Sequence, residues 1–272
     1  MKLQSPLLFI GGGNMASAIL SGLLRQGANP SLLQVVEPDA AARARLQALG
    51  VQAEAALQPA HAQAALVVWA VKPQVLREAA LAAAPLLGSA LHLSVAAGIR
   101  SDSLAGWLGT ERLVRAMPNT PALVGQGMTA LRAAGGVSGA DRALVEQVLA
   151  ATGRLIWVEH EAQMDAVTAL SGSGPAYVFY FLEAMIEAGV SLGLSAEQSR
   201  ELAQATFAGS AALAAQSDES PQVLRERVTS KGGTTYAALC ALEAAQVKPH
   251  FVQAMQAAAQ RAAELGDEFG RP

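Results

Sequence analysis

A glycine-rich turn near the start of the chain constrains its fold more than any other feature. Residues 9–16, with the sequence FIGGGNMA, follow a short apolar run and open a segment with helical spacing of apolar residues. In that setting the pattern G-x-G-x-x-A is typical of a strand, turn and helix that bind a dinucleotide. Gly11 permits the tight turn, Gly13 lets the backbone approach a pyrophosphate, and Ala16 keeps helix and strand in contact. The alternative is a tight turn that holds no ligand.

The turn is expected to contact a nicotinamide coenzyme. The residues assigned to that contact are Ile10, Gly11, Gly12, Gly13, Asn14 and Met15. About twenty residues beyond the turn stands Glu37, where a carboxylate accepts hydrogen bonds from the adenosine ribose and favours NADH. Arg43 and Arg45 follow and can pair with a 2′-phosphate, which favours NADPH, or they simply lie on a solvated helix face. The sequence leaves NADPH and NADH both open.

Apolar runs alternate with helical patterns over roughly the first 160 residues, as in proteins with a parallel sheet covered on both faces. Strands are expected at residues 7–10, 33–36, 65–70, 91–95 and 113–116, and helices at 14–26, 39–49, 73–84 and 103–108. Two further edge strands are expected at 128–131 and 155–158, with a helix at 140–151 between them. The first part of the chain is therefore predicted to have an α/β fold with a mainly parallel sheet.

After His160 the strand patterns stop and alanine-rich helical patterns take over. Helices are expected at residues 176–192, 196–215, 221–228, 234–245 and 248–265. Ser195 and Ser220 stand where N-caps are wanted, Pro221 suits a first turn, and Ser173 or Gly174 is expected to cap the helix that Pro175 begins. Glycine follows two of these helices, at 193 and 266, as a stop signal. The second part of the chain is predicted to be entirely helical.

Composition excludes several classes of protein. Of the 272 residues, 52% are hydrophobic and 15% are charged, which rules out a disordered chain. No apolar stretch approaches about 20 residues, so no membrane span is expected. The net charge of −3, without a basic run, gives no support to nucleic-acid binding. The expected partners are a small molecule and further copies of the chain.

Cysteine and histidine content argues against disulfides and metal sites. Cys240 is alone and cannot form an internal disulfide, and no export signal precedes the first strand, which together favour a reducing cytoplasm. The four histidines are scattered and lack partners at metal-ligand spacing, so no metal is assigned.

Small and polar residues follow three of the expected strands, at the sheet edge where such folds bind ligands. The residues assigned to the coenzyme there are Ala70, Val71, Lys72 and Pro73, then Ala96, Ala97 and Gly98, and finally Asn119. Small side chains at 96–98 leave room for a flat ring. Lys72 can instead be an ordinary surface lysine, and Asn119 can bond its own turn.

A loop of small residues in the second part, residues 228–235 with the sequence VTSKGGTT, leads into a helix. Free N–H groups of Gly233, Thr234 and Thr235 form an anion-binding nest suited to a substrate carboxylate. A threonine hydroxyl there can bond to a reacting heteroatom. The alternative is a glycine loop with a threonine N-cap.

Six blocks in register resemble the pyrroline-5-carboxylate reductase family over nearly the whole chain. They are FIGxGNM from Phe9, AVKP from Ala70, AAGI from Ala96, MPNTP from Met117, SGSGPAY from Ser171 and TSxGGTT from Thr229. Any one block can arise by chance, whereas six in order are specific. The resemblance implies an oxidoreductase that uses NADPH or NADH to reduce 1-pyrroline-5-carboxylate to L-proline, the last step of proline biosynthesis.

The resemblance also implies the domain organisation and the substrate site. It implies a Rossmann domain, residues 1–161, followed by an all-helical dimerisation and substrate-binding domain, residues 162–272. The second domain is expected to intertwine with that of another copy, in a homodimer that can assemble into a decamer of five dimers. The substrate residues implied are Val228, Ser230, Gly232, Gly233, Thr234 and Thr235, and the hydroxyl of Thr235 near the ring nitrogen is the catalytic candidate. Lys231 stands where the family usually has proline.

Two other functions are compatible with a coenzyme-binding domain followed by helices. A β-hydroxyacid dehydrogenase or another imine reductase shares the order of domains, but dehydrogenases of this kind generally use a lysine in the helical domain. No lysine lies between Gln163 and Glu226. A nucleotide-responsive binding module without turnover is the other alternative, and it would bind the coenzyme without oxidising it.

Overall fold

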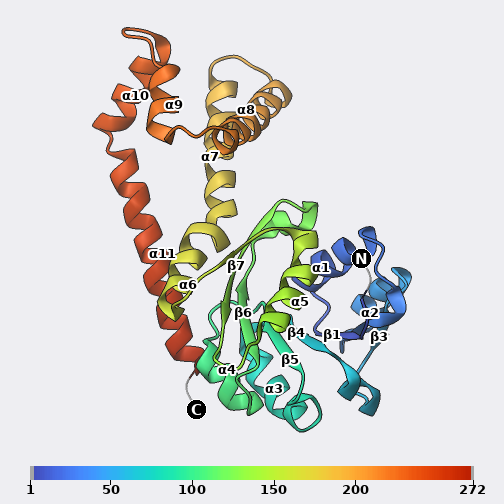
Figure 1. Cartoon of the computed structure of the whole chain (residues 1–272). Helices are drawn as coiled ribbons and strands as arrows, with labels where there is room; N and C mark the ends of the chain where they lie inside the picture. The colour runs from blue at the N-terminus through green and yellow to red at the C-terminus, as the bar shows by residue number, and fades with distance from the viewer. Residues whose placement is uncertain (1–2, 271–272) are drawn as a thin grey trace. The chain divides into compact units, whose positions relative to one another are not determined.

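A computed structural model describes residues 3–270, which form two compact units. One unit is built from residues 3–173 together with 258–270, and the other from residues 174–257. The first unit contains an eight-stranded sheet and the second contains only helices (Figure 1). Among the described residues, no helix has both the length and the apolar character needed to cross a membrane.

The sheet has the strand order β3-β2-β1-β4-β5-β6-β7-β8. Its strands are β1 (Leu7–Ile10), β2 (Leu33–Val36), β3 (Gln52–Glu54), β4 (Leu66–Trp69), β5 (Leu91–Ser94), β6 (Leu113–Met117), β7 (Gly127–Ala133) and β8 (Gly153–Trp157). Every pair of neighbours is parallel except β6 and β7, which are antiparallel. The predicted mainly parallel sheet is confirmed.

The expected position of β7 in the sheet is wrong. It lies between β6 and β8, so only β8 is an edge strand on this side. Strand β3, which the sequence did not predict, forms the other edge and contains one buried residue, Ala53, between two exposed ones. Its apolar signal is too short to stand out from the surrounding loop.

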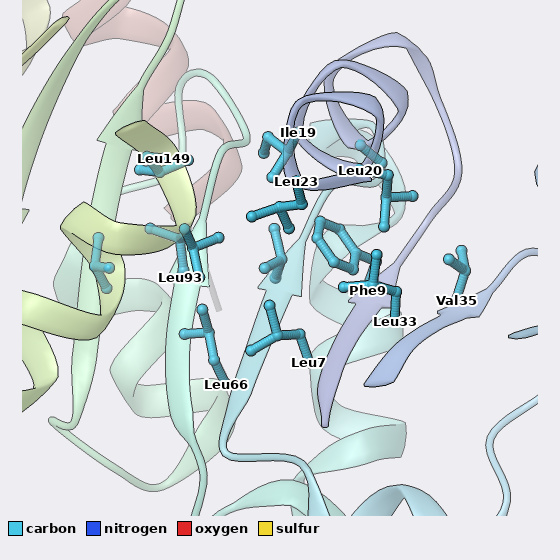
Figure 2. Packing of buried hydrophobic residues seen from close by; sticks show 14 of the residues in the cluster. Leu7, Phe9, Ile19, Leu20, Leu23, Leu33, Val35, Leu66, Leu93 and Leu149 are labelled. Atoms are coloured by element: carbon cyan, nitrogen blue, oxygen red, sulfur yellow. The ribbon is translucent and has the colours of Figure 1, made fainter. Parts of the chain in front are cut away.

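Helices cover both faces of this sheet. Alternate side chains of β1 point to opposite faces, and both sets are buried against helices. Leu7 and Phe9 belong to one buried cluster with residues of α1 (Asn14–Arg25) and α5 (Gly139–Leu149). Figure 2 shows Phe9 packed beside Leu20 and Leu23 of α1. Leu8 and Ile10 belong to the opposite cluster. Each fully buried leucine there contributes about 1.5–3 kcal/mol relative to an exposed one.

The second cluster joins the sheet to α3 (Pro73–Leu87) and α4 (Ser101–Leu108). The remaining helices of this unit are α2 (Ala40–Ala48) and α6 (Glu161–Val167), which runs into a π-helical turn, Thr168–Gly172. Coverage of both faces leaves the carboxyl ends of the parallel strands as the open edge where a ligand can bind.

The helical unit begins at Gly174. Its helices are α7 (Gly174–Ser191), α8 (Ala196–Gln216), α9 (Pro221–Arg227), α10 (Thr234–Ala244) and the start of α11 (Val247–Gly270). Two predicted caps are confirmed: the hydroxyl of Ser195 accepts from the N–H of Gln198, and that of Ser220 from the N–H of Val223. The N-cap predicted at residue 173 or 174 is wrong, because Ser173 has helical dihedrals and Gly174 is already the first residue of α7.

One predicted helix stop is also wrong. Gly193, with φ +99°, follows α7 as expected, but α11 continues through Gly266 to Gly270. A Cβ on Gly266 would lie 2.7 Å from Nε of Arg100. Gly266 therefore serves close packing of α11 against the loop before α4 and is not a helix stop.

Candidate active site

The glycine turn after β1 has the geometry of an anion-binding site. Gly11 has φ +97°, and a Cβ there would lie 2.8 Å from the carbonyl oxygen of Ala70. Gly13 is extended, a Cβ on it would meet nothing within 4 Å, and it caps α1 without a side-chain hydrogen bond. The first N–H groups of α1 have no acceptor among the described residues, and the helix dipole favours a phosphate there.

Glu37 lies beside this turn, in the position after β2. Its Oε2 accepts from the N–H of Gly12 at 2.8 Å and its Oε1 from the N–H of Asp39 at 2.9 Å. The half-buried carboxylate is thus fixed against the glycine turn by two main-chain donors. Each oxygen keeps a lone pair with which it can accept a further hydrogen bond.

The two arginines proposed for a 2′-phosphate differ in their surroundings. The Nη1 of Arg43 donates to the carbonyl oxygens of Glu37 at 2.8 Å and Pro38 at 2.6 Å. Arg43 therefore braces the loop that carries Glu37. Arg45 is exposed on α2, and among the described residues it has no hydrogen-bond partner.

The ends of β4 and β5 place the next group of predicted residues at the same edge. The N–H of Ala70 donates to the carbonyl oxygen of Ile10 at 2.8 Å, so the segment from Ala70 to Pro73 adjoins the glycine turn. Lys72 is exposed and caps α3, whose first residue is Pro73.

After β5, Ala96 is buried and Ala97 is exposed. Gly98 is buried with φ +72°, and a Cβ on it would lie 3.3 Å from Cβ of Leu265 in α11. The positive φ, together with contact between the end of α11 and this loop, thus accounts for the glycine at 98. Contact of all three residues with a coenzyme stays a prediction.

Asn119 uses its side chain to hold the chain together. Its amide nitrogen donates to the carbonyl oxygen of Ser171 at 3.3 Å and to the hydroxyl at 3.2 Å, and its Oδ1 accepts from the N–H of Met128 at 2.9 Å. These bonds fix the end of β6 to the π-helical turn before Ser173. The side chain therefore orders this loop, and contact with the coenzyme stays a prediction.

In the helical unit, the loop from 228 to 235 supplies two free donors, one fewer than expected. Gly232 has φ +73°, and the N–H of Gly233 donates to the carbonyl oxygen of Ser230 at 3.0 Å. The prediction that the N–H of Gly233 is free is therefore wrong. Within the described residues, the N–H groups of Thr234 and Thr235 have no hydrogen-bond acceptor, as expected in the first turn of α10. Thr235 is half-buried, whereas Val228, Ser230 and Lys231 are exposed.

A partly buried ion cluster on β6 and β7 was not predicted from the sequence. Glu161, the first residue of α6, pairs with Arg115 at 2.5 Å and Arg132 at 3.0 Å. It also accepts from the N–H and hydroxyl of Ser101 at 3.1 and 3.0 Å. Glu161 thereby joins β6, β7, α4 and α6. The sequence does carry one sign of this cluster, because Arg115 is a charged residue within the otherwise apolar strand β6. Arg115 is 2% exposed.

Burial excludes one histidine from acid–base chemistry. Burial lowers the pKa of His92 from 6.5 to about 4, and its Nδ1 accepts from Nε1 of Trp69 at 3.0 Å, so it is a neutral core residue. Among residues 3–270, no group of three or more His, Cys, Asp or Glu side chains is placed to hold a metal ion.

Comparison with protein families gives two matches. The family described as pyrroline-5-carboxylate reductase dimerisation matches residues 161–265. The family described as NADP oxidoreductase, coenzyme F420-dependent, matches residues 6–98. The first match covers most of the predicted helical domain, and the second covers the glycine turn together with Glu37.

Individual relatives align over almost the whole chain. Pyrroline-5-carboxylate reductase of Pseudomonas aeruginosa is 43% identical, over 97% of this chain and 98% of the relative. That of Pisum sativum is 38% identical over 94% of each chain. The structure of a pyrroline-5-carboxylate reductase from Coxiella burnetii has a TM-score of 0.90 and 37% identity, covering 97% of this chain and 99% of that one.

The structure of pyrroline carboxylate reductase from Plasmodium falciparum, with NADP bound, has a TM-score of 0.86 and 30% identity, covering 97% of this chain and 98% of that one. Prephenate dehydrogenase from Aquifex aeolicus, at 13% identity, shares the fold alone. The likeness of sequence and structure confirms the predicted fold class and the resemblance drawn from the six motifs. This protein belongs to the pyrroline-5-carboxylate reductase family of oxidoreductases.

Proposed function

We propose that this protein reduces 1-pyrroline-5-carboxylate to L-proline with NADPH or NADH, as the last step of proline biosynthesis. The observation that carries the proposal is the 43% identity over 97% of the chain to a curated pyrroline-5-carboxylate reductase. The glycine turn and Glu37 support a place for the coenzyme, and the free N–H groups of the 228–235 loop support a place for an anionic substrate.

The chain's own residues fit the coenzyme. The bare backbone at Gly13 and the unpaired N–H groups at the start of α1 suit a pyrophosphate, and the carboxylate of Glu37 suits the hydroxyls of a ribose. The ends of β4, β5 and β6 supply the remaining assigned contacts. When bound, the coenzyme supplies a hydride.

The 228–235 loop is proposed to hold the substrate. The N–H groups of Thr234 and Thr235 bind the carboxylate, while Gly232 and Gly233 keep the turn open and Val228 and Ser230 line it. The hydroxyl of Thr235 supports the ring nitrogen, which must gain a proton as the neighbouring carbon gains the hydride. A hydroxyl is a weak acid, so water is the proposed source of that proton. Positioning and exclusion of bulk water do most of the catalysis.

The helical domain, residues 162–272, is proposed to form an intertwined homodimer with the active site at the interface, which can assemble further into a decamer. Large apolar side chains support an interface, because many remain exposed on this part of the chain. They include Val178, Phe179, Tyr180, Leu192, Leu202 and Leu213. Residues 1–161 form the proposed coenzyme domain, and the proposed location is the cytoplasm.

A single assay tests the proposed reaction. The protein is mixed with 1-pyrroline-5-carboxylate and either NADH or NADPH, while coenzyme oxidation is followed by absorbance and proline is measured by chiral chromatography. We expect coenzyme to be consumed and L-proline to form in equal amounts. Coenzyme binding without oxidation would favour a nucleotide-responsive module. In a parallel assay with a β-hydroxyacid and oxidised coenzyme, turnover of that acid but not of the imine would favour a dehydrogenase.

A further inference from the structure

We propose that Glu37 makes this protein select NADH over NADPH. The inference rests on the proposed function, because it concerns the coenzyme of that reaction. The two coenzymes differ only in the 2′-phosphate of the adenosine ribose, so the groups that follow β2 decide between them.

The position of the Glu37 carboxylate is fixed by the backbone on both sides. Its two oxygens accept from the N–H groups of Gly12 and Asp39, at 2.8 and 2.9 Å. A Cβ on Gly12 would lie 3.3 Å from Oε2, so the carboxylate packs directly against the glycine turn. If it swung away to admit a phosphate, the partly buried N–H of Gly12 would lose its acceptor.

Charge then separates the two coenzymes. Carboxylate oxygens accept hydrogen bonds from the 2′- and 3′-hydroxyls of a ribose, and such charge-assisted bonds are strong. A 2′-phosphate offers only acceptors and carries about −1.5 to −2 charges at neutral pH. Set beside an ionised carboxylate, it is repelled.

The nearby cations do not offset this repulsion. Nη1 of Arg43 is bonded to the carbonyl oxygens of Glu37 and Pro38, which orients this guanidinium toward the loop backbone. Arg45 lies exposed on α2, where solvent and salt screen it. Asp39 adds a second carboxylate to the loop, although its Oδ1 caps α2 through the N–H of Ala42.

The test is equilibrium binding of NADH and of NADPH, measured by calorimetry for the intact protein and for three variants. Glu37→Gln keeps an acceptor for the N–H of Gly12 but removes the charge. Glu37→Ser replaces the carboxylate with a short hydroxymethyl side chain. Asp39→Asn is the matched control, since it removes a charge two residues away and keeps a good helix cap. Thermal melting of each variant checks that it folds.

The wild-type protein is expected to bind NADH about tenfold or more tightly than NADPH, given the size of Coulomb effects near a protein surface. Glu37→Gln and Glu37→Ser should bring the two affinities within about threefold, mainly by tightening NADPH. Asp39→Asn should keep the wild-type preference.

Equal or tighter binding of NADPH by the wild-type protein would overturn the inference, as would an unchanged preference in both Glu37 variants. If both variants fail to fold, the wild-type preference alone decides. Reduction of the imine with NADPH preferred would overturn the inference and leave the proposed function standing. Failure of the protein to bind either coenzyme would overturn both.

Discussion

Gly11 and Gly13 lie in one turn, but they lack side chains for different reasons. At Gly11 the backbone has φ +97° and a Cβ would contact Ala70, so the fold itself requires glycine. At Gly13 the backbone has φ −70° and a Cβ would meet nothing, so no described residue requires glycine there. The structural role of Gly11 thus differs from the coenzyme-binding role proposed for Gly13 in the same motif.

Two alanine substitutions should therefore behave oppositely. Gly13→Ala should leave the thermal midpoint nearly unchanged, because the loss from a weaker helix cap is offset by the lower entropy of the unfolded chain. The same substitution should raise the coenzyme Kd by about tenfold or more. Gly11→Ala should lower the free energy of unfolding by about 2 kcal/mol or more. Melting curves and coenzyme titrations measure both, and a Gly13→Ala protein that binds normally would remove Gly13 from the coenzyme site.

Thr235→Val should lower kcat/KM for the imine by about 10- to 100-fold, because the hydroxyl proposed to support the ring nitrogen is replaced by a methyl group of the same size. The coenzyme Kd should not change. Thr235→Ser is the control, since it retains a hydroxyl and should keep most of the activity. Melting curves show whether α10 is intact, and unchanged turnover in Thr235→Val would remove Thr235 from the mechanism.

The sequence predicts residue roles where they depend on the local backbone and not where they depend on distant neighbours. Gly11 is an example of the first kind, because a strand, a tight turn and a helix define its dihedral angles. Gly266 and Asn119 are examples of the second kind. Gly266 lies against Arg100, and the amide of Asn119 bonds to Ser171, both far away in the sequence.

At the scale of elements, Glu161 holds two strands and two helices together through ion pairs and hydrogen bonds around the buried Arg115. Without Glu161, the nearly inaccessible charge of Arg115 would lose its ion-pair partner. Glu161→Ala should lower the free energy of unfolding by about 3 kcal/mol, the lower end of the range for broken buried pairs, because Glu161 is 24% exposed. Urea unfolding measures this change.

Glu264→Ala is the matched control for that experiment. Glu264 pairs with Arg261 on a solvent-exposed face of α11, where screening leaves ion pairs weak. The urea midpoint of Glu264→Ala should equal that of the wild-type protein. Equal effects of the two substitutions would show that Glu161 does not have the structural role assigned to it.

The first turn of α5 provides a pH-dependent contribution to stability. A hydrogen bond from Arg112, opposed by burial, lowers the pKa of Asp141 from 3.8 to about 2. Because the folded pKa lies below the unfolded one, the stabilisation is complete above about pH 4 and disappears as the pH falls through about 2. Arg112 is 43% exposed, so about 1–2 kcal/mol is expected at neutral pH.

Asp141→Asn should therefore be less stable than the wild-type protein at neutral pH, and the difference should narrow below pH 4. Urea unfolding across this range measures it. Asp102→Asn, a change at an exposed carboxylate in the first turn of α4, should show no such narrowing. If the difference in free energy of unfolding between the wild-type protein and Asp141→Asn stayed constant down to pH 2, this would contradict the role given to the pair of Arg112 and Asp141.

The sequence predicts elements well where a run of apolar residues is buried on both sides. The strands β1, β2, β4, β5 and β6 were all placed within one or two residues of their bounds. Strand β3 has only Ala53 to mark it, and the position of β7 depends on which strands it pairs with. Pairing order is a property of the whole sheet, so a local pattern cannot supply it.

At the scale of the whole molecule, the helical unit has a surface that a lone chain leaves uncovered. Phe179 is 58% exposed, Tyr180 69% and Leu192 84%. Large exposed apolar side chains on one unit favour an interface, in agreement with the dimerisation family that matches residues 161–265. The sequence alone gives the helices but not the partner, because amphipathic spacing does not distinguish a face that packs internally from one that packs on another copy.

The measurement that tests the central claim most directly is a crystal structure of the protein with oxidised coenzyme and L-proline. We predict an oligomer in which the proline carboxylate accepts hydrogen bonds from the N–H groups of Thr234 and Thr235. The ring nitrogen should lie within hydrogen-bond distance of the Thr235 hydroxyl, and the ring should stack on a nicotinamide held by the glycine turn of a subunit. Proline bound elsewhere, or a 228–235 loop remote from the coenzyme of every subunit, would contradict the account.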